Sequence, residues 1–357
     1  MGSRTIFNGR EMDYFAGTGY LGLQSHPLVI RAAQEALGRF GLSTATSRGG
    51  YGEHPIYDEL ERAACAYFDA ERVLYFSSGY LGSSILTQTT CNLFDHIFID
   101  SSAHFSLWDA AHATNLPITP FHHLSPQSLS DCLHNHLRNS ERPLVLSDGV
   151  FPISGEIAPL PDYLDLVRTN RGLVYLDDAH AVGVLGPRGH GTPEYYDIWD
   201  KNCSTCATLS KALGGFGGLI WGSAKTINRM DRESRIMVGA SPPPLVIAAA
   251  SAKALALAHN LPEIRQQLWD NVRHVRTSLR ALGLNLPDTP VPIICLGAEQ
   301  DINLQVVKNK LFEQSIAVEL VRSYTSTPPG GALRIAIFAT HTIAQIDRLI
   351  ETIGKSI

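Results

Sequence analysis

Segments with strand character alternate regularly with segments of helix character between residues 55 and 222. The strand segments are short, contain many β-branched residues and are bounded by glycine or aspartate, which is typical of strands covered by helices on both faces. The alternation predicts an α/β fold with a mostly parallel central sheet and flanking helices. The predicted strands are 72–77, 96–100, 118–122, 143–147, 172–176 and 219–222. The predicted helices between them are 55–69, 81–91, 105–114, 126–139 and 161–170.

The pattern changes in the last third of the chain, after predicted helices at 224–235, 242–258 and 262–282. Strands at 291–296, 316–320 and 333–338 then mix with helices at 301–313 and 342–354, which predicts a smaller α+β domain. We expect three parts: a large domain, a C-terminal small domain, and an N-terminal segment whose helix 27–40 packs with the small domain. Their predicted ranges are 46–258, 259–357 and 1–45, in that order.

Composition excludes several classes of protein. The net charge is −5, and no stripe of lysine or arginine is visible, so we expect no nucleic-acid partner. The most apolar stretch, 245–258, is too short to span a bilayer, and no secretion signal is visible, so we expect a cytoplasmic protein without a membrane contact. Six scattered cysteines fit reduced thiols, and the single CxxC, Cys203 and Cys206, lacks the second ligand pair of a metal site.

A single lysine lies between small hydroxyl residues and a glycine-rich turn in the run 208–218. A lysine that attacks an aldehyde needs a confined site that lowers its pKa. Lys211 has apolar neighbours on both sides, and the glycines let a cofactor approach the backbone closely. The alternative is a surface lysine beside a flexible loop.

An acidic pair and a histidine, Asp177-Asp-Ala-His180, follow the predicted strand 172–176. The carboxyl end of a buried strand is where ligands bind in open α/β sheets. A carboxylate there can pair with a protonated ring nitrogen and keep a pyridine ring acting as an electron sink. A metal ligand set and a helix cap are the alternatives. Lys211, one strand later, favours the interpretation of a carboxylate that pairs with a ring nitrogen.

Two further strand ends carry candidate binding residues. Ser78-Gly79-Tyr80 leads into a helix, whose free N–H groups form a phosphate site, and the Thr208 hydroxyl can add a contact. The alternative for this turn is a simple helix cap. His104, at the start of another helix, can stack flat on a cofactor ring, or it can be a structural histidine.

Seven ordered motifs across about residues 17–355 together resemble the α-oxoamine synthases, fold type I enzymes dependent on pyridoxal 5′-phosphate (PLP). The motifs are Tyr20-Leu-Gly-Leu, His54-Pro-x-x-x-Glu-Leu-Glu61, Ser78-Gly-Tyr80, Gly149-Val-Phe151, Asp177-Asp-Ala-His180, Gly186-x-x-Gly-x-Gly191 and Thr208-x-x-Lys211.

The resemblance implies a role for each cofactor-site residue. Lys211 would hold PLP covalently and later move protons at the substrate α-carbon, while Asp177 would pair with the ring nitrogen. His104 would stack on the ring, and His180 would hydrogen-bond near its phenolic oxygen. The Ser78-Gly79-Tyr80 turn would bind the phosphate through backbone amides.

The substrate side matches the family less closely. Arg334, on a predicted strand, matches the family arginine that binds the amino-acid carboxylate, a role that suits a planar guanidinium. A salt-bridged strand arginine is the alternative. Residues that depart from the family pattern are Gly19, Ser83, Pro152, Gly239, Ala240 and the shifted Ser241.

The resemblance implies decarboxylating condensation of a small amino acid with an acyl-CoA, giving an α-aminoketone, in a homodimer. Enzymes that make 8-amino-7-oxononanoate or 2-amino-3-ketobutyrate are the most similar subtypes, and the loop after Asp-Asp-Ala-His favours the first. The departures leave a second hypothesis, transamination or another reaction at the α-carbon. A third is a non-catalytic partner subunit, against which the retained Lys211 argues.

Overall fold

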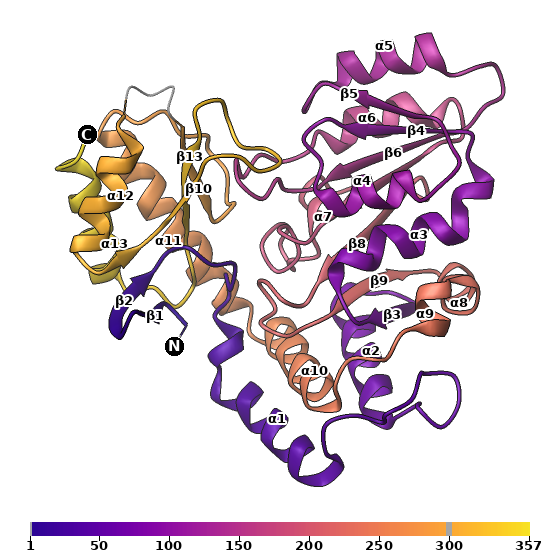
Figure 1. Cartoon of the computed structure of the whole chain (residues 1–357), viewed down its shortest axis with the longest axis horizontal. Coiled ribbons are helices and arrows are strands. Elements are labelled where there is room, and N and C mark those ends of the chain that lie inside the picture. The colour runs from indigo at the N-terminus through magenta and orange to yellow at the C-terminus, as the bar shows by residue number, and fades with distance from the viewer. Residues whose placement is uncertain (1, 298–301) are drawn as a thin grey trace.

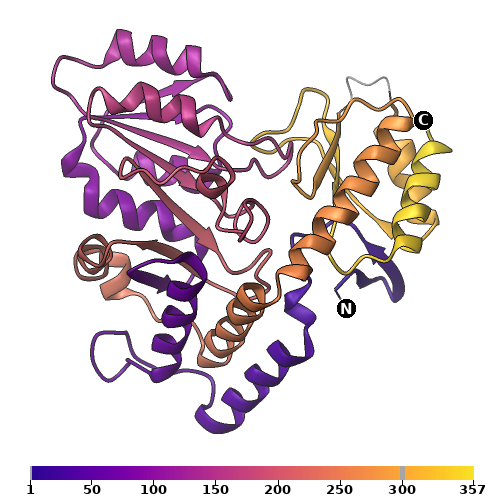
Figure 2. The same ribbon diagram turned by 180° about the vertical axis from the view of Figure 1, so that it is seen from behind.

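The computed structural model describes residues 2–297 and 302–357, which form a larger and a smaller lobe (Figures 1 and 2). The predicted N-terminal segment begins at residue 1 and the predicted helix 301–313 at residue 301, and both of these residues lie outside the described ranges. The larger lobe contains a seven-stranded sheet of order β3-β9-β8-β7-β6-β4-β5. Only β9 runs antiparallel to its neighbours, which confirms the mostly parallel sheet. The strands are β3 (Arg72–Phe76), β4 (His96–Asp100), β5 (Ile118–Phe121), β6 (Pro143–Asp148), β7 (Leu173–Asp177), β8 (Cys203–Thr208) and β9 (Gly218–Gly222).

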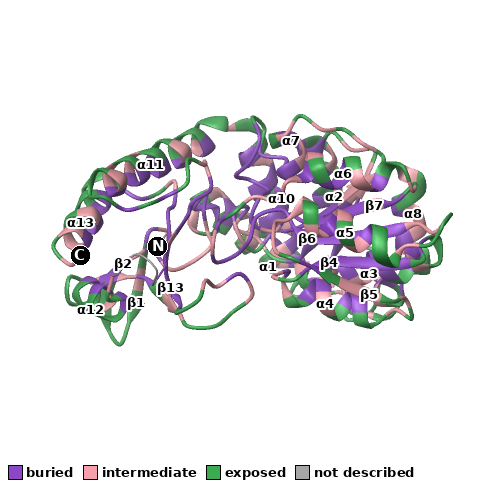
Figure 3. Ribbon diagram, turned by 90° about the horizontal axis from the view of Figure 1, so that it is seen from above, coloured by how far each residue is buried: buried purple, intermediate pink, exposed green. Residues whose placement is uncertain are grey.

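Helices cover both faces of this sheet, and the strands are buried between them (Figure 3). In β4, Ile97 and Ile99 pack into one apolar cluster and Phe98 packs into another on the opposite face. This division explains why the strand sequences read as continuous apolar runs rather than alternating ones. The helices are α2 (Pro55–Phe68), α3 (Gly82–Thr90), α4 (Phe105–His112), α5 (Pro126–His136), α6 (Leu160–Arg168), α7 (Thr192–Tyr195), α8 (Ala224–Glu233), α9 (Arg235–Gly239) and α10 (Leu245–Asn260).

Strand β8 received no bounds from the sequence, because its six residues, Cys-Ser-Thr-Cys-Ala-Thr, contain no branched aliphatic side chain. Tertiary contacts determine its conformation: it pairs in parallel with β7 and antiparallel with β9. Its Cys206 is fully buried, while Cys203 is partly exposed, and both thiols are free. Strand β8 matters for the site because it ends at Thr208, three residues before Lys211.

The smaller lobe is built on a three-stranded antiparallel sheet of order β10-β13-β12. The predicted strand 316–320 is divided into a short bridge to the N-terminal strands, β11, and an edge strand, β12. The elements are α11 (Pro262–Ala281), β10 (Ile293–Gly297), α12 (Leu304–Glu313), β11 (Ile316–Ala317), β12 (Glu319–Val321), β13 (Ala332–Ala336) and α13 (Ile343–Gly354). Thr342 and Gln345 form a capping box, which determines the residue at which α13 begins.

The N-terminal segment divides between the two lobes. Strands β1 (Arg4–Phe7) and β2 (Arg10–Tyr14) join β11 of the smaller lobe. Helix α1 (Pro27–Phe40) instead lies along α10 (Figure 1), and the backbone N–H of Leu245 donates to the carbonyl of Leu42. The predicted packing of helix 27–40 with the small domain is therefore wrong. The physical reason is that the alanine-rich α10 offers α1 a close-packing surface in the larger lobe.

Within the two described ranges, no single helix has the length and hydropathy needed to cross a membrane. Helices α10 and α11 reach that length and composition only as a pair, and they are bent by 76° relative to each other.

Candidate active site

A cavity of about 190 Å³ lies at the carboxyl edge of the central sheet. Asp148, Asp177 and Thr208 are the last residues of β6, β7 and β8, so the parallel register brings them to the same edge. We call this space the lysine cavity. Its lining residues are Ser78, Gly79, Tyr80, His104, Ser106, Asp148, Asp177, Ala179, His180, Thr208, Ser210 and Lys211. The structure thus brings together all eight residues predicted to contact the cofactor, and it adds Ser106, Asp148, Ala179 and Ser210.

Lys211 follows β8 in a tight turn that its glycines make possible. The N–H of Leu209 donates to the carbonyl of Gly217, and Gly214 adopts a positive φ of 63°. Burial lowers the pKa of the Lys211 amine, and the charge of Asp177 opposes this decrease. A lowered pKa makes the neutral amine, which is the nucleophile, accessible nearer to neutral pH.

Asp148 is a site residue that the sequence analysis missed. It lies directly opposite Asp177 in the β6–β7 register, and its Oδ2 accepts the backbone N–H of His104 at 2.8 Å. Burial, reinforced by the charge of Asp177, raises the pKa of Asp148 well above its usual range. Two adjacent carboxylates cannot both ionise easily, so Asp148 favours its protonated form and leaves the charge on Asp177. An acid that ends a buried strand next to Asp177 was the available signal.

The anion-binding end of the cavity is the turn between β3 and α3. The Ser78 Oγ accepts the N–H of Tyr80, which begins the short helical turn Gly79–Leu81 that runs into α3. A Cβ on Gly79 would lie 2.6 Å from the Cβ of Thr208, so only glycine fits there. The Thr208 Oγ1 accepts the N–H of Ser210. Backbone amides and hydroxyls therefore converge as they do in phosphate sites at helix N-termini.

His104 is held from both lobes. Its Nδ1 lies 2.8 Å from the Ser106 Oγ, and its Nε2 lies 3.0 Å from the hydroxyl of Tyr324, a residue of the smaller lobe. The ring of Tyr80 approaches it edge-on, with 5.9 Å between ring centroids. Burial lowers the pKa of His104, so its ring favours the neutral form that can stack on another aromatic ring. No local sequence pattern connects Tyr324 with a histidine 220 residues away.

The Tyr324→Phe variant is expected to reduce turnover about three- to ten-fold, because one hydrogen bond that orients His104 is lost. The change should appear in kcat and in the absorbance of the bound cofactor, with KM for the acyl donor little changed. Tyr51→Phe, at a fully exposed position, is the matched control. Unchanged kcat and absorbance in Tyr324→Phe would contradict a positioning role for Tyr324.

His180, Tyr20 and Arg334 form a chain of hydrogen bonds beside the lysine cavity. Arg334 donates to the Tyr20 hydroxyl at 3.2 Å, and the Tyr20 hydroxyl lies 2.7 Å from the His180 Nδ1. Because the tyrosine oxygen accepts from Arg334, its proton goes to Nδ1, which places the histidine's own proton on Nε2. Burial and the charges of Lys211 and Arg334 lower the pKa of His180 well below its usual value.

Arg334 itself lies on β13, buried and outside the lining of the lysine cavity. Its Nε donates to the Pro152 carbonyl at 2.7 Å, and one terminal nitrogen donates to the Gly17 carbonyl at 3.3 Å. It forms no ion pair with a described carboxylate, so the salt-bridge alternative is not supported. Pro152 departs from the family pattern, but its contribution here comes from a carbonyl, which any residue supplies.

The other departures lie in simpler surroundings. A Cβ on Gly19 would meet the side-chain amide of Gln24, at 2.4 Å from its Nε2. Ser83 is buried in the first turn of α3. Gly239 ends α9, where an added Cβ meets nothing within 4 Å, and neither Ala240 nor Ser241 lines the lysine cavity of this chain.

The segment that carries Pro152 is anchored by His123. This histidine lies 2.9 Å from the buried Asp100 through Nδ1 and 3.3 Å from Glu156 through Nε2. Its contacts with the two carboxylates outweigh burial and raise the pKa of His123 to about 9. Protonated His123 therefore fixes the hairpin 150–157, whose ends pair at Val150 and Ile157.

The His123→Gln variant is expected to lose about 2 to 3 kcal/mol of unfolding free energy at pH 6. Because the pKa of His123 is raised on folding, its stabilisation is complete below about 6.5 and is lost as pH rises through about 9. Denaturant unfolding of the variant and wild type at pH 6 and 10 should therefore show a difference that shrinks at the higher pH. His134→Gln, exposed on α5, is the control, and a pH-independent loss in His123→Gln would contradict the ion pairing.

Comparisons with known proteins agree with this geometry. Residues 16–353 match the model of the family described as aminotransferase class I and II. The 8-amino-7-oxononanoate synthase of Trichlorobacter lovleyi is 31% identical over 99% of this chain and 90% of its own length. The synthase of the same name from Alkaliphilus oremlandii is 30% identical over 99% and 89%.

Solved structures give the same result for the fold. Serine palmitoyltransferase from S. paucimobilis, with bound PLP and myriocin, superposes with a TM-score of 0.91 at 25% identity, covering 99% of this chain and 89% of that chain. The 8-amino-7-oxononanoate synthase of Francisella tularensis has a TM-score of 0.80 at 24% identity, over 96% and 97%. The prediction of a fold type I architecture is confirmed.

The lysine cavity fits PLP by the chemistry of its donors. The turn at Ser78–Tyr80 supplies amide and hydroxyl groups for a phosphate, and Lys211 supplies an amine with a lowered pKa. Asp177 lies at the same edge of the sheet, where its carboxylate can pair with a ring nitrogen. His104 offers an aromatic face. A phosphate, an aldehyde and a pyridine ring are thus each matched by a residue that lines one cavity.

Proposed function

The chain belongs to the α-oxoamine synthases, PLP-dependent acyltransferases of the class I and II aminotransferase family, and we propose that it makes 8-amino-7-oxononanoate. The observation that carries this proposal is the convergence of Lys211, Asp177, His104 and the Ser78–Tyr80 turn on one cavity. The names of relatives that match nearly the whole chain support the choice of product.

The structure of the product defines its two precursors. Carbons 8 and 9 of 8-amino-7-oxononanoate, with their amine and methyl group, correspond to alanine without its carboxyl group. Carbons 1 to 7 correspond to a seven-carbon dicarboxylic acid activated at one end, which is a pimeloyl thioester. One carbon–carbon bond forms between the alanine α-carbon and the thioester carbonyl carbon. Two bonds break: the thioester C–S bond, and the bond between the alanine α-carbon and its carboxyl carbon. CoA thiol and carbon dioxide leave.

Lys211 is the proton carrier in this proposal. When bound, PLP supplies an electron sink that stabilises negative charge at the substrate α-carbon. The neutral amine of Lys211, favoured by its lowered pKa, removes the proton from that carbon and later returns one. Asp177 holds a proton at the ring nitrogen, and Asp148, which favours its own protonated form, leaves Asp177 as the charged partner.

The remaining residues orient the reactants. The Ser78–Tyr80 turn and Thr208 would hold the phosphate, and His104 would cover one face of the ring. Neutral His180 would donate a hydrogen bond from Nε2 near the phenolic oxygen of the ring. Arg334 binds the amino-acid carboxylate. Its donors already serve Tyr20 and the carbonyls of Pro152, Gly17 and Ala16. The substrate replaces the two longest of these contacts, which run from one terminal nitrogen to Gly17 and Ala16 at 3.3 and 3.5 Å.

We also propose a homodimer in the cytoplasm. Large apolar side chains are exposed on the loop between α1 and α2, on α9 and beside the lysine cavity. A second copy of the chain would cover them. The residues are Leu42, Phe105, Phe216 and Val238. The thiols of Cys65, Cys91, Cys132, Cys203 and Cys206 form no disulfide, which supports a reducing compartment.

Product analysis tests the reaction. The enzyme with PLP, alanine and pimeloyl-CoA is expected to release one free thiol and one carbon dioxide for each 8-amino-7-oxononanoate formed. Glycine and serine with the same thioester, and alanine with acetyl-CoA, are the specificity controls. Formation of a keto acid and an aminated cofactor without thiol release would establish transamination instead. Absence of both products would favour a non-catalytic subunit.

A further inference from the structure

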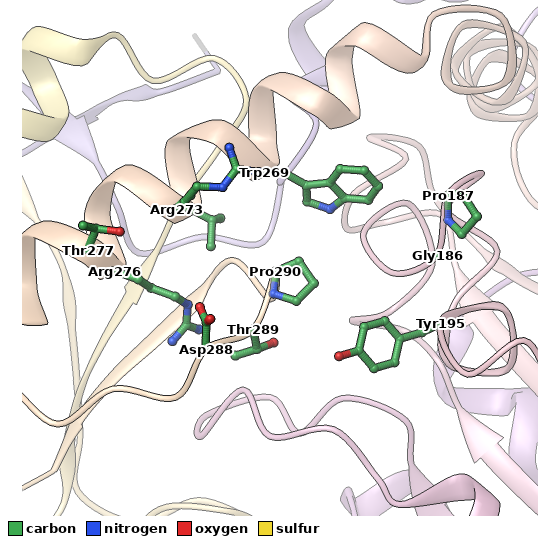
Figure 4. A pocket seen from close by; sticks show the side chains of 11 residues that line it. Gly186, Pro187, Tyr195, Trp269, Arg273, Arg276, Thr277, Asp288, Thr289 and Pro290 are labelled. Atoms are coloured by element: carbon green, nitrogen blue, oxygen red, sulfur yellow. The ribbon is translucent and has the colours of Figure 1, made fainter.

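A second cavity, of about 510 Å³, lies between the two lobes and shares no lining residue with the lysine cavity. One wall is α11 with the segment 288–290 that precedes β10, and the other is the glycine-rich turn at 186–187 with α7 (Figure 4). We call it the interlobe cavity. Its volume is within the range of about 300 to 1,000 Å³ that small-molecule sites occupy.

One end of the interlobe cavity is aromatic and apolar. The Trp269 indole donates its Nε1–H to the Val184 carbonyl at 2.9 Å, which fixes the ring between the lobes. Pro187 and Tyr195 lie across the cavity from α11 (Figure 4), and no described residue hydrogen-bonds to the Tyr195 hydroxyl. This end therefore offers a flat surface for an aromatic ring and a free hydroxyl beside it.

The other end carries a buried cation, Arg276, that forms no ion pair with a described carboxylate. Arg276 is 2% exposed, and its guanidinium donates to three backbone carbonyls, those of Pro287, Val291 and Ile293, at 2.9 to 3.0 Å. Its Nε has no hydrogen-bond partner among the described residues. No described carboxylate lies within 4.0 Å of its guanidinium nitrogens. Asp288, which also lines the cavity, pairs instead with Arg280 at 3.4 Å.

Burial of the Arg276 charge costs free energy, and this cost lowers the pKa of the guanidinium. Burial, reinforced by the charge of Arg280 and opposed by that of Asp288, lowers the pKa of Arg276 to about 10. Carbonyl dipoles satisfy hydrogen bonds but do not neutralise a whole charge. Arg273, one turn earlier on α11, lines the exposed side of the cavity, where its guanidinium pairs with Asp270 at 2.9 Å. An anion in the cavity would supply the missing compensation.

We propose that the interlobe cavity binds a small aromatic carboxylate, with the ring against Trp269 and the carboxylate toward Arg276 and Arg273. Such a ligand touches α11 of the smaller lobe and the turn at Pro187 of the larger lobe, so it stabilises one arrangement of the two lobes. The glycine-rich turn lies only six residues after His180 in the chain. The site is independent of the proposed reaction and offers a way to regulate it.

Isothermal titration of the PLP-loaded enzyme with matched probes tests this inference. The probes are benzoate, phenylacetate and indole-3-acetate, each compared with its neutral amide. At least one acid is expected to bind at least about ten-fold more tightly than its amide, because only the acid compensates Arg276. If no acid binds more tightly than its amide, the proposal is overturned.

Variants locate the binding. Trp269→Ala is expected to weaken the acid at least about ten-fold, since the aromatic wall is lost. Arg276→Gln is expected to remove the difference between acid and amide, while Arg31→Gln, exposed on α1, should leave it unchanged. Should Arg276→Gln fail to fold, the Trp269→Ala result and the acid–amide comparison decide alone. Undiminished binding to Trp269→Ala would contradict the proposed site.

Discussion

The Lys211→Ala variant is expected to release thiol from the acyl-CoA at less than about one-thousandth of the wild-type rate, because both covalent attachment and proton transfer are lost. No other lysine lines the lysine cavity in the described ranges, so no neighbouring amine can substitute. The matched control is Lys225→Ala on α8, an exposed lysine outside the cavity, which should keep wild-type turnover.

Steady-state thiol release, measured with saturating alanine and pimeloyl-CoA, gives the comparison. The Lys211→Ala protein should remain folded, because alanine leaves the backbone bonds of the turn at Leu209 and Gly217 intact. Turnover above about a tenth of wild type would mean that another group moves the proton, and the account of the site would be wrong.

The Asp177→Asn variant has the second largest expected effect, a loss of about 10² to 10⁴ in kcat/KM. Asparagine has nearly the same shape, but it cannot keep a proton on the ring nitrogen. The substitution also removes a charge that raises the pKa of Lys211, so that pKa should fall further. A pH profile of kcat/KM together with the absorbance of the bound cofactor reports both changes.

Asp148→Asn is the matched control for Asp177→Asn, since it changes the adjacent acid on the neighbouring strand. The raised pKa of Asp148 favours its protonated form, which asparagine imitates, so the loss in kcat/KM should stay below about ten-fold. Equal losses in the two variants would contradict the assignment of the charge to Asp177.

The larger lobe could be predicted closely because its signals are local. Predicted strand 96–100 coincides with β4, and predicted helices begin within a few residues of the observed ones. Since parallel strands end at one edge, the sequence alone places Asp177 and Lys211 in a common site. The bounds of strand β8 could not be predicted, because its pairing with β7 and β9, rather than its own composition, makes it a strand.

Contacts between distant parts of the chain could not be predicted. The bond from Tyr324 to His104 and the packing of α1 on α10 depend on how the lobes meet, which no local pattern encodes. Pro152 illustrates a related limit, because the sequence shows only that its side chain departs from the family pattern, whereas in the structure its carbonyl accepts a hydrogen bond from Arg334. Asp148 was overlooked although it ends a buried strand beside Asp177.

The central claim is that Lys211 binds PLP covalently inside the lysine cavity, and borohydride reduction tests it most directly. The enzyme is incubated with PLP, reduced, digested and analysed by peptide mass spectrometry. We expect a single pyridoxyl group on the peptide that contains Lys211, and none in the Lys211→Ala protein. A pyridoxyl group on another lysine, or the absence of any such group on wild-type enzyme, would contradict the account.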